Sequence, residues 1–323
     1  MKVDMKNINN MKQTCIFVLG MHRSGTSALT GTLNLLNVSL GNELMKPHDM
    51  NQKGFFENMG IYNLNINFLK KINSCWDDLF YTESKLNALE DTKELEVFLK
   101  EEFKNSQIFA IKDPRLAYLF PLYKKALTNM GVNIKVIIPY RNPLEVASSL
   151  KKRNQFSQEK GLLLWTHHLL LSEKLTRDLP RVFINFKELL TSPQKVIKLI
   201  DQKLMLTLSS EYISKETQIA NFLTPNLKHE NISIDNLSEK LPKQISNLMS
   251  LIPELNKKNL DEKFNKFLQQ YSDNQSLFYN NDVIEGMQDQ LEVSEKKLLK
   301  KDLEIAQTNQ ALQVKDKELE LAN

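Results

Sequence analysis

Short apolar segments alternate with longer amphipathic segments over the first two thirds of the chain. The apolar segments predict strands at 16–19, 107–111, 134–139 and 181–185. The amphipathic segments predict helices at 27–38, 63–71, 93–103, 116–130, 143–152, 159–178 and 192–204. Strands that alternate with helices favour a parallel sheet that is covered by helices on both faces. The pattern therefore predicts an α/β fold.

The pattern changes near residue 231, where apolar runs become rare and no further strand is predicted. We expect a polar N-terminal tail at 1–13, an α/β domain at 14–230, a helical extension at 231–280 and a coiled-coil-like helix at 281–323. In the last region apolar residues recur every seven positions, at Ile284, Leu291, Leu298, Ile305, Leu312 and Leu319. This repeat is typical of a coiled coil that joins copies of the chain into a homo-oligomer.

The second seam of the same helix is poor in apolar residues. Lys301 and Lys315 stand where a coiled coil prefers an apolar side chain. A solvated helix with one apolar stripe therefore remains an alternative interpretation.

Composition excludes several classes of function. The chain has 323 residues, 41% of them hydrophobic, and a formal net charge of +4, which is too small to indicate general nucleic-acid binding. The polar first 13 residues lack the apolar core of a signal peptide, and no apolar run approaches the length of a membrane span. We expect a cytoplasmic protein with no transmembrane segment and no nucleic-acid partner.

Candidate chemistry begins in the segment 15–31, which reads CIFVLGMHRSGTSALTG. A strand, a glycine turn and a helix in this order direct backbone N–H groups and a helix N-terminus at an anion. The spacing from Gly20 to Gly25 matches the phosphate loop of nucleotide enzymes, but Thr26 stands where that loop has Lys. Arg23 supplies a cation from within the loop instead.

Two further strands end in cationic turns. Lys112 follows the second strand in the sequence KDPR, and Arg141 follows the third in YRNP. Ser149 lies eight residues after Arg141, across the strand end and two helical turns, so both side chains can reach one phosphate. Because parallel strands end at a common edge where ligands bind, we expect Arg23, Lys112 and Arg141 to lie close together.

The motifs GMHRSGTS, IKDPR and YRNPLEVASSL together resemble those of sulfotransferases that use 3′-phosphoadenosine-5′-phosphosulfate (PAPS). The resemblance is to the bacterial type, which is related to tyrosylprotein and carbohydrate sulfotransferases, and it covers about residues 14–230. It implies a P-loop-like parallel sheet flanked by helices. It also implies an enzyme that transfers a sulfuryl group from PAPS to an acceptor hydroxyl, releases 3′,5′-adenosine bisphosphate and needs no metal.

The resemblance also implies roles for individual residues. The first loop would bind the 5′-phosphosulfate group through His22, Arg23, Ser24, Gly25, Thr26 and Ser27. Arg141 and Ser149 would bind the 3′-phosphate. Lys112 would approach the bridging oxygen and, with Arg23, act in catalysis by offsetting charge on the leaving phosphate. Lys228, in PNLKH, stands where a late basic element of the family usually has Arg, whereas Phe186 replaces a usual Tyr and receives no ligand role.

A base must accept the proton of the acceptor hydroxyl. Glu57 in KGFFEN is our choice, because an aromatic setting would raise its pKa toward a useful value. Glu43 and His48 are alternatives, and a structural role for Glu57 remains equally open. We expect Asp113 to anchor its turn, and His167 and His168 to line the core or an acceptor pocket.

Two competing functions follow from the same residues. A P-loop kinase or NTPase would use Asp113 as a metal ligand, but Thr26 in the Lys position argues against it. An inactive nucleotide-fold scaffold carried on a coiled coil is the other. For a sulfotransferase, a carbohydrate hydroxyl is the expected acceptor, while protein tyrosine, lipid and small molecules stay open.

Overall fold

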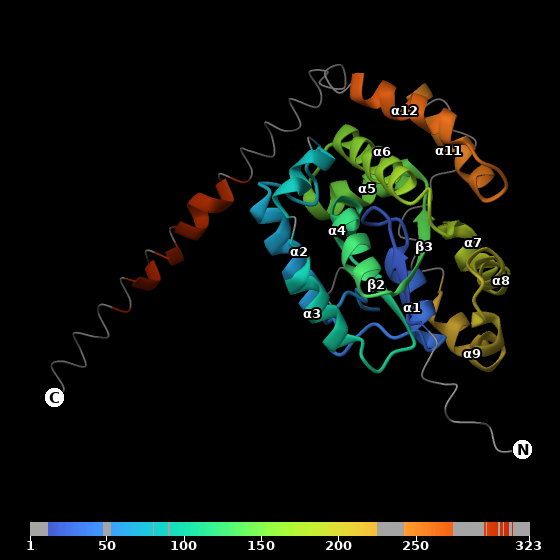
Figure 1. Ribbon diagram of the computed structural model, residues 1–323. Helices are drawn as coiled ribbons and strands as arrows, with labels where there is room; N and C mark the ends of the chain where they lie inside the picture. The colour runs from blue at the N-terminus through green and yellow to red at the C-terminus, as the bar shows by residue number, and fades with distance from the viewer. Residues whose placement is uncertain are drawn as a thin grey trace, which may run out of the picture.

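Four parallel strands form the centre of the molecule. The computed structural model describes residues 12–47, 53–79, 81–89, 91–224 and 242–273, together with part of 294–312. The strands are β1 (Thr14–Val18), β2 (Ile108–Lys112), β3 (Asn133–Tyr140) and β4 (Arg181–Asn185). All neighbours pair in parallel, in the order β2-β1-β3-β4. Strands β2 and β3 are labelled in Figure 1. The predicted α/β fold with a parallel sheet is confirmed.

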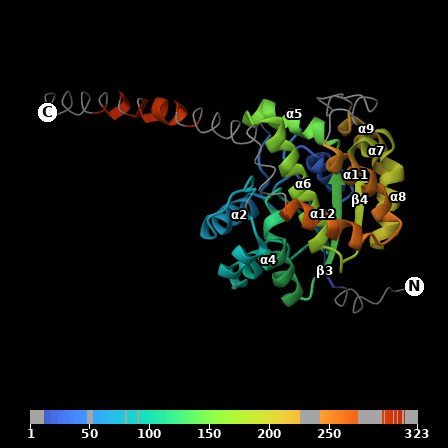
Figure 2. The same cartoon turned by 90° about the horizontal axis from the view of Figure 1, so that it is seen from above.

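Alternating side chains of β1 face two separate layers of helices. Cys15 and Phe17 pack into one apolar cluster, while Ile16 and Val18 pack into the other. Figure 2 shows helices on both sides of the strands. On the Phe17 side lie α2 (Met59–Lys71), α3 (Lys93–Glu102), α4 (Leu116–Asn129), α5 (Pro143–Asn154), α6 (Gln158–Leu175) and the 3₁₀ helix η2 (Glu83–Ala88). On the Val18 side lie α1 (Thr26–Leu35), α7 (Phe186–Thr191), α8 (Pro193–Leu204) and α9 (Leu208–Phe222).

Residues 242–273 add a further layer to the Phe17 side. They form α11 (Lys243–Leu251), the 3₁₀ helix η5 (Ile252–Asn256) and α12 (Asp261–Asp273). Ile252 and Phe264 are fully buried in the same cluster as Phe17. The side chain of Asn256 accepts from the backbone N–H of Phe183 at 2.8 Å and donates to its carbonyl at 2.7 Å. This part of the predicted extension therefore shares a core with the sheet.

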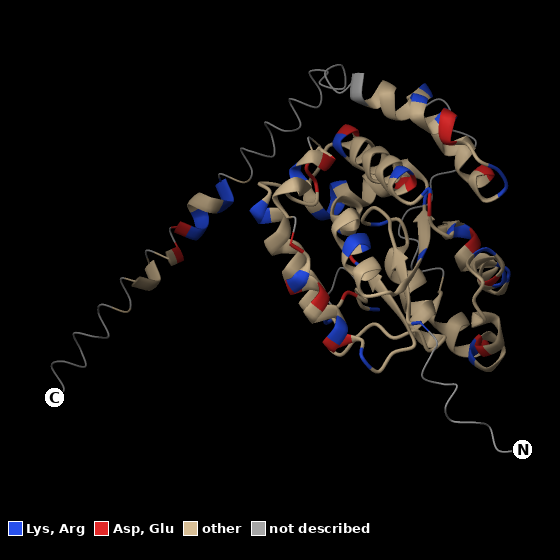
Figure 3. Ribbon diagram, in the orientation of Figure 1, with Lys and Arg blue, Asp and Glu red and all other residues tan. Residues whose placement is uncertain are grey.

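The described residues of segment 294–312 are helical. Leu298, Ile305 and Leu312 of the seven-residue repeat are 64%, 57% and 55% exposed. The described charged residues of this segment are four lysines, between 296 and 301, followed by Asp302 and Glu304 (Figure 3). The described region thus has an apolar stripe that the other described residues leave exposed, and its oligomeric role stays a prediction.

No helix within the described ranges is both long and apolar enough to cross a membrane.

Several helices differ from their predicted bounds, and for two of them an asparagine explains the difference. α2 begins at Met59 instead of residue 63, because the side chain of Asn58 caps it by accepting from the Ile61 N–H at 3.1 Å. α1 ends at Leu35 instead of residue 38, because Asn37 takes a positive φ of 64° and ends the helical path.

Candidate functional site

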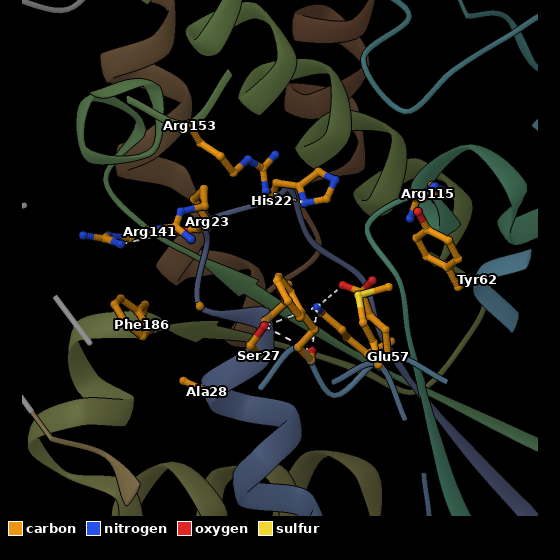
Figure 4. A pocket seen from close by; sticks show the side chains of 15 residues that line it. His22, Arg23, Ser27, Ala28, Glu57, Tyr62, Arg115, Arg141, Arg153 and Phe186 are labelled. Atoms are coloured by element: carbon orange, nitrogen blue, oxygen red, sulfur yellow. Dashed lines mark hydrogen bonds and ion pairs between the residues drawn. The ribbon is translucent and has the colours of Figure 1, made fainter. Parts of the chain in front are cut away.

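The carboxyl ends of the strands enclose a cavity of 240 Å³. Val18 and Lys112 are aligned in the sheet register, and Arg141 and Phe186 follow the aligned pair Tyr140 and Asn185. Side chains from all four strand ends therefore meet here (Figure 4). The lining residues are His22, Arg23, Gly25, Thr26, Ser27, Ala28, Met45, Phe55, Glu57, Tyr62, Lys112, Arg115, Arg141, Arg153 and Phe186.

The glycine turn presents the first turn of α1 to this cavity. Gly25 has φ +91°, and α1 begins at the next residue, Thr26. The first N–H groups of a helix have no intrahelical acceptor and carry its positive dipole end, so this turn is suited to bind an anion. A Cβ at Gly25 would lie 2.2 Å from the Phe186 ring. Both the φ angle and this close approach therefore require glycine.

Lys112 and Glu57 form a buried ion pair on the cavity floor. The Lys112 Nζ donates to Glu57 Oε1 at 2.5 Å, to the Phe55 carbonyl at 3.0 Å and to Ser27 Oγ at 3.3 Å. Each of the two charged residues is 4% exposed. Burial raises the pKa of the Glu57 carboxyl, and the nearby Lys112 charge opposes that increase. The proposed base thus has a raised pKa, as expected, and contacts Lys112, one of the two other predicted catalytic residues.

Arg23, Arg141 and Ser149 form a second group beside the loop. The Arg23 Nε donates to Ser149 Oγ at 2.6 Å, and the Arg141 Nη1 donates to the Arg23 carbonyl at 3.4 Å. Glu145 accepts from the Arg141 Nε at 2.6 Å, and the Arg141 guanidinium lies 5.0 Å from the Phe186 ring centre. The structure therefore brings together the loop arginine and the two residues expected at a 3′-phosphate.

Seven lining residues were not among the predicted site residues, and three of these, Tyr62, Arg115 and Arg153, carry polar or charged groups. The Arg115 guanidinium lies 4.5 Å from the ring centre of Tyr62, and its Nη1 donates to Asp113 at 2.9 Å. The Arg153 guanidinium lies 5.5 Å from the Trp76 ring centre, with its Nη1 3.4 Å from the His22 Nδ1. Burial, followed by the nearby Arg23 charge, lowers the pKa of Arg153 to about 10.

One of these residues had a signal in the sequence. Arg153 lies four residues after Ser149 on α5, and residues at this spacing share a helix face. It also ends the basic run 151–153, which has the appearance of an ordinary positively charged helix end. Tyr62 falls in α2, in the turn that the prediction left out.

Other candidate residues lie away from the cavity lining. Glu43 is exposed, and its backbone carbonyl accepts from the Met59 N–H. His167 and His168 are buried core residues, and the His168 Nε2 lies 3.1 Å from the Trp76 carbonyl. His48 and Lys228 lie outside the described residues.

Asp113 anchors its turn, as expected. Its carboxylate accepts from the backbone N–H and the side chain of Arg115 and, at 3.1 Å, from Asn65. Asn65 in turn accepts from the Tyr123 hydroxyl at 2.7 Å. Both carboxylate oxygens are therefore engaged by residues of this chain.

The cavity has a strong excess of positive charge. Four of the six arginines in the sequence line it with Lys112, and the only carboxylate among the described lining residues is Glu57. A concave surface of one charge sign concentrates its field, and arginine binds phosphate and sulfate through paired donors. The described residues include no group of three or more His, Cys, Asp or Glu side chains arranged to hold a metal ion. The site is suited to a ligand with several negative charges.

Comparison with known proteins gives matches among solved structures only. No family model and no curated protein matches the chain. The sulfotransferase domain of the Synechococcus PCC 7002 olefin synthase aligns with 18% identity and a TM-score of 0.44, over 75% of this chain and 96% of that one. Sulfotransferase STF9 from Mycobacterium avium aligns with 13% identity and a TM-score of 0.40, over 72% and 76%. At these values the activity must be argued from the site itself.

Proposed function

We propose that this protein is a sulfotransferase that binds PAPS in the described cavity and transfers its sulfuryl group to an acceptor hydroxyl on a carbohydrate. One observation carries the proposal. The glycine turn, Arg23, Arg141 and the Lys112–Glu57 pair come from distant parts of the sequence and line a single cavity, and Ser149 contacts Arg23 beside it. Each group matches one chemical need of this reaction: binding the 5′-phosphosulfate, binding the 3′-phosphate, and moving a proton near a developing negative charge.

Donor binding is assigned to the loop and the α5 end of the cavity. The N–H groups at the start of α1 and the Arg23 side chain hold the 5′-phosphosulfate group. Arg141 and Ser149 hold the 3′-phosphate, and Phe186 and Glu145 fix the position of the Arg141 guanidinium. The 3′-phosphate would distinguish this donor from nucleotides that carry phosphate at the 5′ position alone.

The transfer step is an in-line displacement at sulfur. The acceptor oxygen forms the new O–S bond, and the bond from sulfur to the bridging phosphate oxygen breaks. The acceptor proton passes to the Glu57 carboxylate, and the positive charges of Lys112 and Arg23 stabilise the leaving phosphate. The 2.5 Å contact between Lys112 and Glu57 supports this division of roles, because both groups lie at one point of the cavity.

The burial and hydrogen bonds of the Asp113 carboxylate argue against a kinase or NTPase. A P-loop enzyme of that class needs an acidic side chain free to hold Mg²⁺ and a lysine in the loop. Asp113 is 1% exposed and its two oxygens bind Asn65 and Arg115, while Thr26 occupies the position of the loop lysine. The observations favour sulfuryl transfer over this alternative.

The transfer reaction itself tests the proposal. Purified protein is incubated with sulfur-labelled PAPS and a fractionated bacterial envelope extract, and the label in carbohydrate is measured after glycosidase digestion. We expect labelled sugars with the wild type and background label with Arg141→Gln. A wild type that transfers no label to any fraction, although it binds the donor product, would overturn the proposed activity.

We also propose that residues 281–323 join copies of the chain. The exposed stripe of Leu298, Ile305 and Leu312 supports this, because a second copy would cover it. Sedimentation of the chain with and without residues 281–323 tests the proposal. A monomer in both cases would contradict it.

A further inference from the structure

Three of the cations that line the cavity form ion pairs with carboxylates of this chain, and Arg153 differs from them. Lys112 pairs with Glu57 at 2.5 Å, Arg141 with Glu145 at 2.6 Å, and Arg115 with Asp113 at 2.9 Å. Arg153 is partly buried and contacts the Asn154 side chain, His22 and the Trp76 ring, and no described carboxylate lies within ion-pair distance of it. Removing a guanidinium from water without a counter-ion is costly, so Arg153 is suited to bind an anion that the described residues do not provide.

His22 does not compensate the charge of Arg153. Burial, followed by the charges of Arg153, Lys112 and Arg115, lowers the pKa of His22 well below its ordinary value. The imidazole is therefore neutral, and its Nδ1 accepts from Arg153. His22 thus lies among three cations and adds no negative charge.

Arg115 and Arg153 have no assigned role in donor binding, although Arg153 adjoins the loop residues His22 and Arg23. Figure 4 shows Tyr62 and Arg115 on the other side of Glu57 from Arg141 and Phe186, with Arg153 and His22 between the two sides. The proposed donor engages the loop, Arg23, Arg141, Ser149 and Lys112. It leaves Arg115 and Arg153, which both line the cavity; the charges acting on Arg153 are those of Arg23, then Glu57, then Arg115.

Arg115 is held in place before any ligand arrives. Asp113 accepts from its Nη1 and from its backbone N–H, and the Tyr62 ring packs against its guanidinium. A guanidinium fixed in this way still has several N–H donors in a planar fork that matches a carboxylate or sulfate.

We propose that Arg115 and Arg153 bind a negatively charged group of the acceptor, so that the substrate is an acidic carbohydrate and not a neutral one. This inference rests on the proposed sulfuryl transfer. The anionic group of the sugar lies between the two guanidinium groups. Its hydroxyl is thereby brought to Glu57, whose charge also acts on Arg153. The arginines act as specificity residues, since they bind a part of the acceptor that does not react.

The test compares an acidic oligosaccharide with a neutral one of the same length. Affinities for an alginate hexasaccharide, which is rich in carboxylates, and for a neutral dextran hexasaccharide are measured by calorimetry at physiological salt with 3′,5′-adenosine bisphosphate bound. The wild type should bind the alginate at least tenfold more tightly. Arg153→Gln should weaken alginate binding about ten- to a hundredfold, as expected for a lost charge-assisted contact, and should retain the bisphosphate.

Arg153→Gln breaks no ion pair of the described chain, so it should fold normally. Arg115→Gln should weaken alginate binding similarly, although it also removes the partner of Asp113. Lys152→Gln is the matched control, because Lys152 is exposed on the same helix, and it should keep the wild-type preference.

Three results would overturn the inference. The first is that the wild type binds both oligosaccharides equally or binds neither. The second is that Arg153→Gln keeps the preference for alginate. The third is that Arg153→Gln loses bisphosphate binding, which would assign Arg153 to the donor site. A wild type that does not bind the bisphosphate would instead contradict the proposed sulfotransferase function.

Discussion

Two buried carboxylates of this protein, Glu173 and Glu57, are paired with cations in different ways. Glu173 on α6 is fully buried and is held by two guanidinium groups. Arg177 donates to both of its oxygens, and Arg181 donates to Oε1 at 3.0 Å. Glu57 in the cavity is held by one ammonium group, that of Lys112.

The difference in pairing distinguishes a carboxylate that supports the fold, Glu173, from one that lines the candidate site, Glu57. The planar forks of Arg177 and Arg181 fix the Glu173 carboxylate in one geometry, and Arg177 extends to Asn265 of α12 at 2.7 Å. α6, β4 and α12 are thereby joined. The Lys112 ammonium is a point charge on a flexible stem and can exchange one oxygen partner for another. We infer that the Glu173 cluster stabilises the fold, whereas the Lys112–Glu57 pair is built to accept a substrate.

Glu57→Gln should produce the largest effect on activity. The amide keeps the shape of the side chain but cannot accept the acceptor proton, so turnover should fall about 10²- to 10⁴-fold. Binding of 3′,5′-adenosine bisphosphate should change little. Steady-state transfer from labelled PAPS and calorimetry of the bisphosphate measure the two quantities. Turnover near the wild-type rate would assign the base role to another residue.

Glu173→Ala should produce the largest effect on stability. It leaves the two arginines without their shared buried carboxylate, and breaking such a cluster costs about 3–5 kcal/mol in the free energy of unfolding. Urea unfolding measures this loss. Glu254→Ala is the control, because Glu254 contacts Lys257 and Lys258 at the surface and its removal should cost far less. Equal losses for the two variants would show that Glu173 has no special structural role.

The scaffold should also lose stability in mild acid, through two histidines of the helix that carries Glu173. Burial lowers the pKa of His167 to about 3 and that of His168 to about 4, from an ordinary value of 6.5. The unfolded chain therefore takes up protons first as pH falls, and the stability present above pH 6.5 declines. The slope should be about 1.4 kcal/mol per pH unit for each histidine between roughly pH 6 and 5. Urea unfolding at several pH values should give a flatter profile for the double variant His167→Gln/His168→Gln, and an unchanged slope would contradict this account.

A smaller effect should appear in the pH dependence of activity. Burial raises the pKa of Glu57 and Lys112 opposes this, so activity should rise with pH as the carboxylate forms. Lys112→Gln removes the opposing charge and should move this acid limb of kcat/KM to higher pH, in addition to lowering the rate. Rates measured with labelled PAPS across pH 4 to 8 test the shift. An acid limb of kcat/KM at the same pH in the wild type and in Lys112→Gln would indicate that Lys112 and Glu57 do not interact during catalysis.

The sheet and the position of the candidate site could be predicted from local sequence, whereas the partners of the buried charges could not. Strand ends and glycine turns are local features, so the chain order predicted the sheet and placed Arg23, Lys112 and Arg141 at one edge. The partner of a buried charge is set by tertiary packing. No local pattern links Lys112 to Glu57, 55 residues away, or Arg23 to Ser149, 126 residues away. Arg153 was missed for the same reason, because its environment depends on Trp76 and His22, which come from other segments.

Thermal unfolding with added nucleotides tests the central claim most directly. The account predicts that 3′,5′-adenosine bisphosphate raises the melting temperature without any metal, by an amount equivalent to about 2.7 kcal/mol at a hundredfold excess over its Kd. Arg141→Gln should lose most of this increase, and ATP with Mg²⁺ should give little. Stabilisation by ATP with Mg²⁺ and none by the bisphosphate would contradict the assignment of the cavity to a sulfuryl donor.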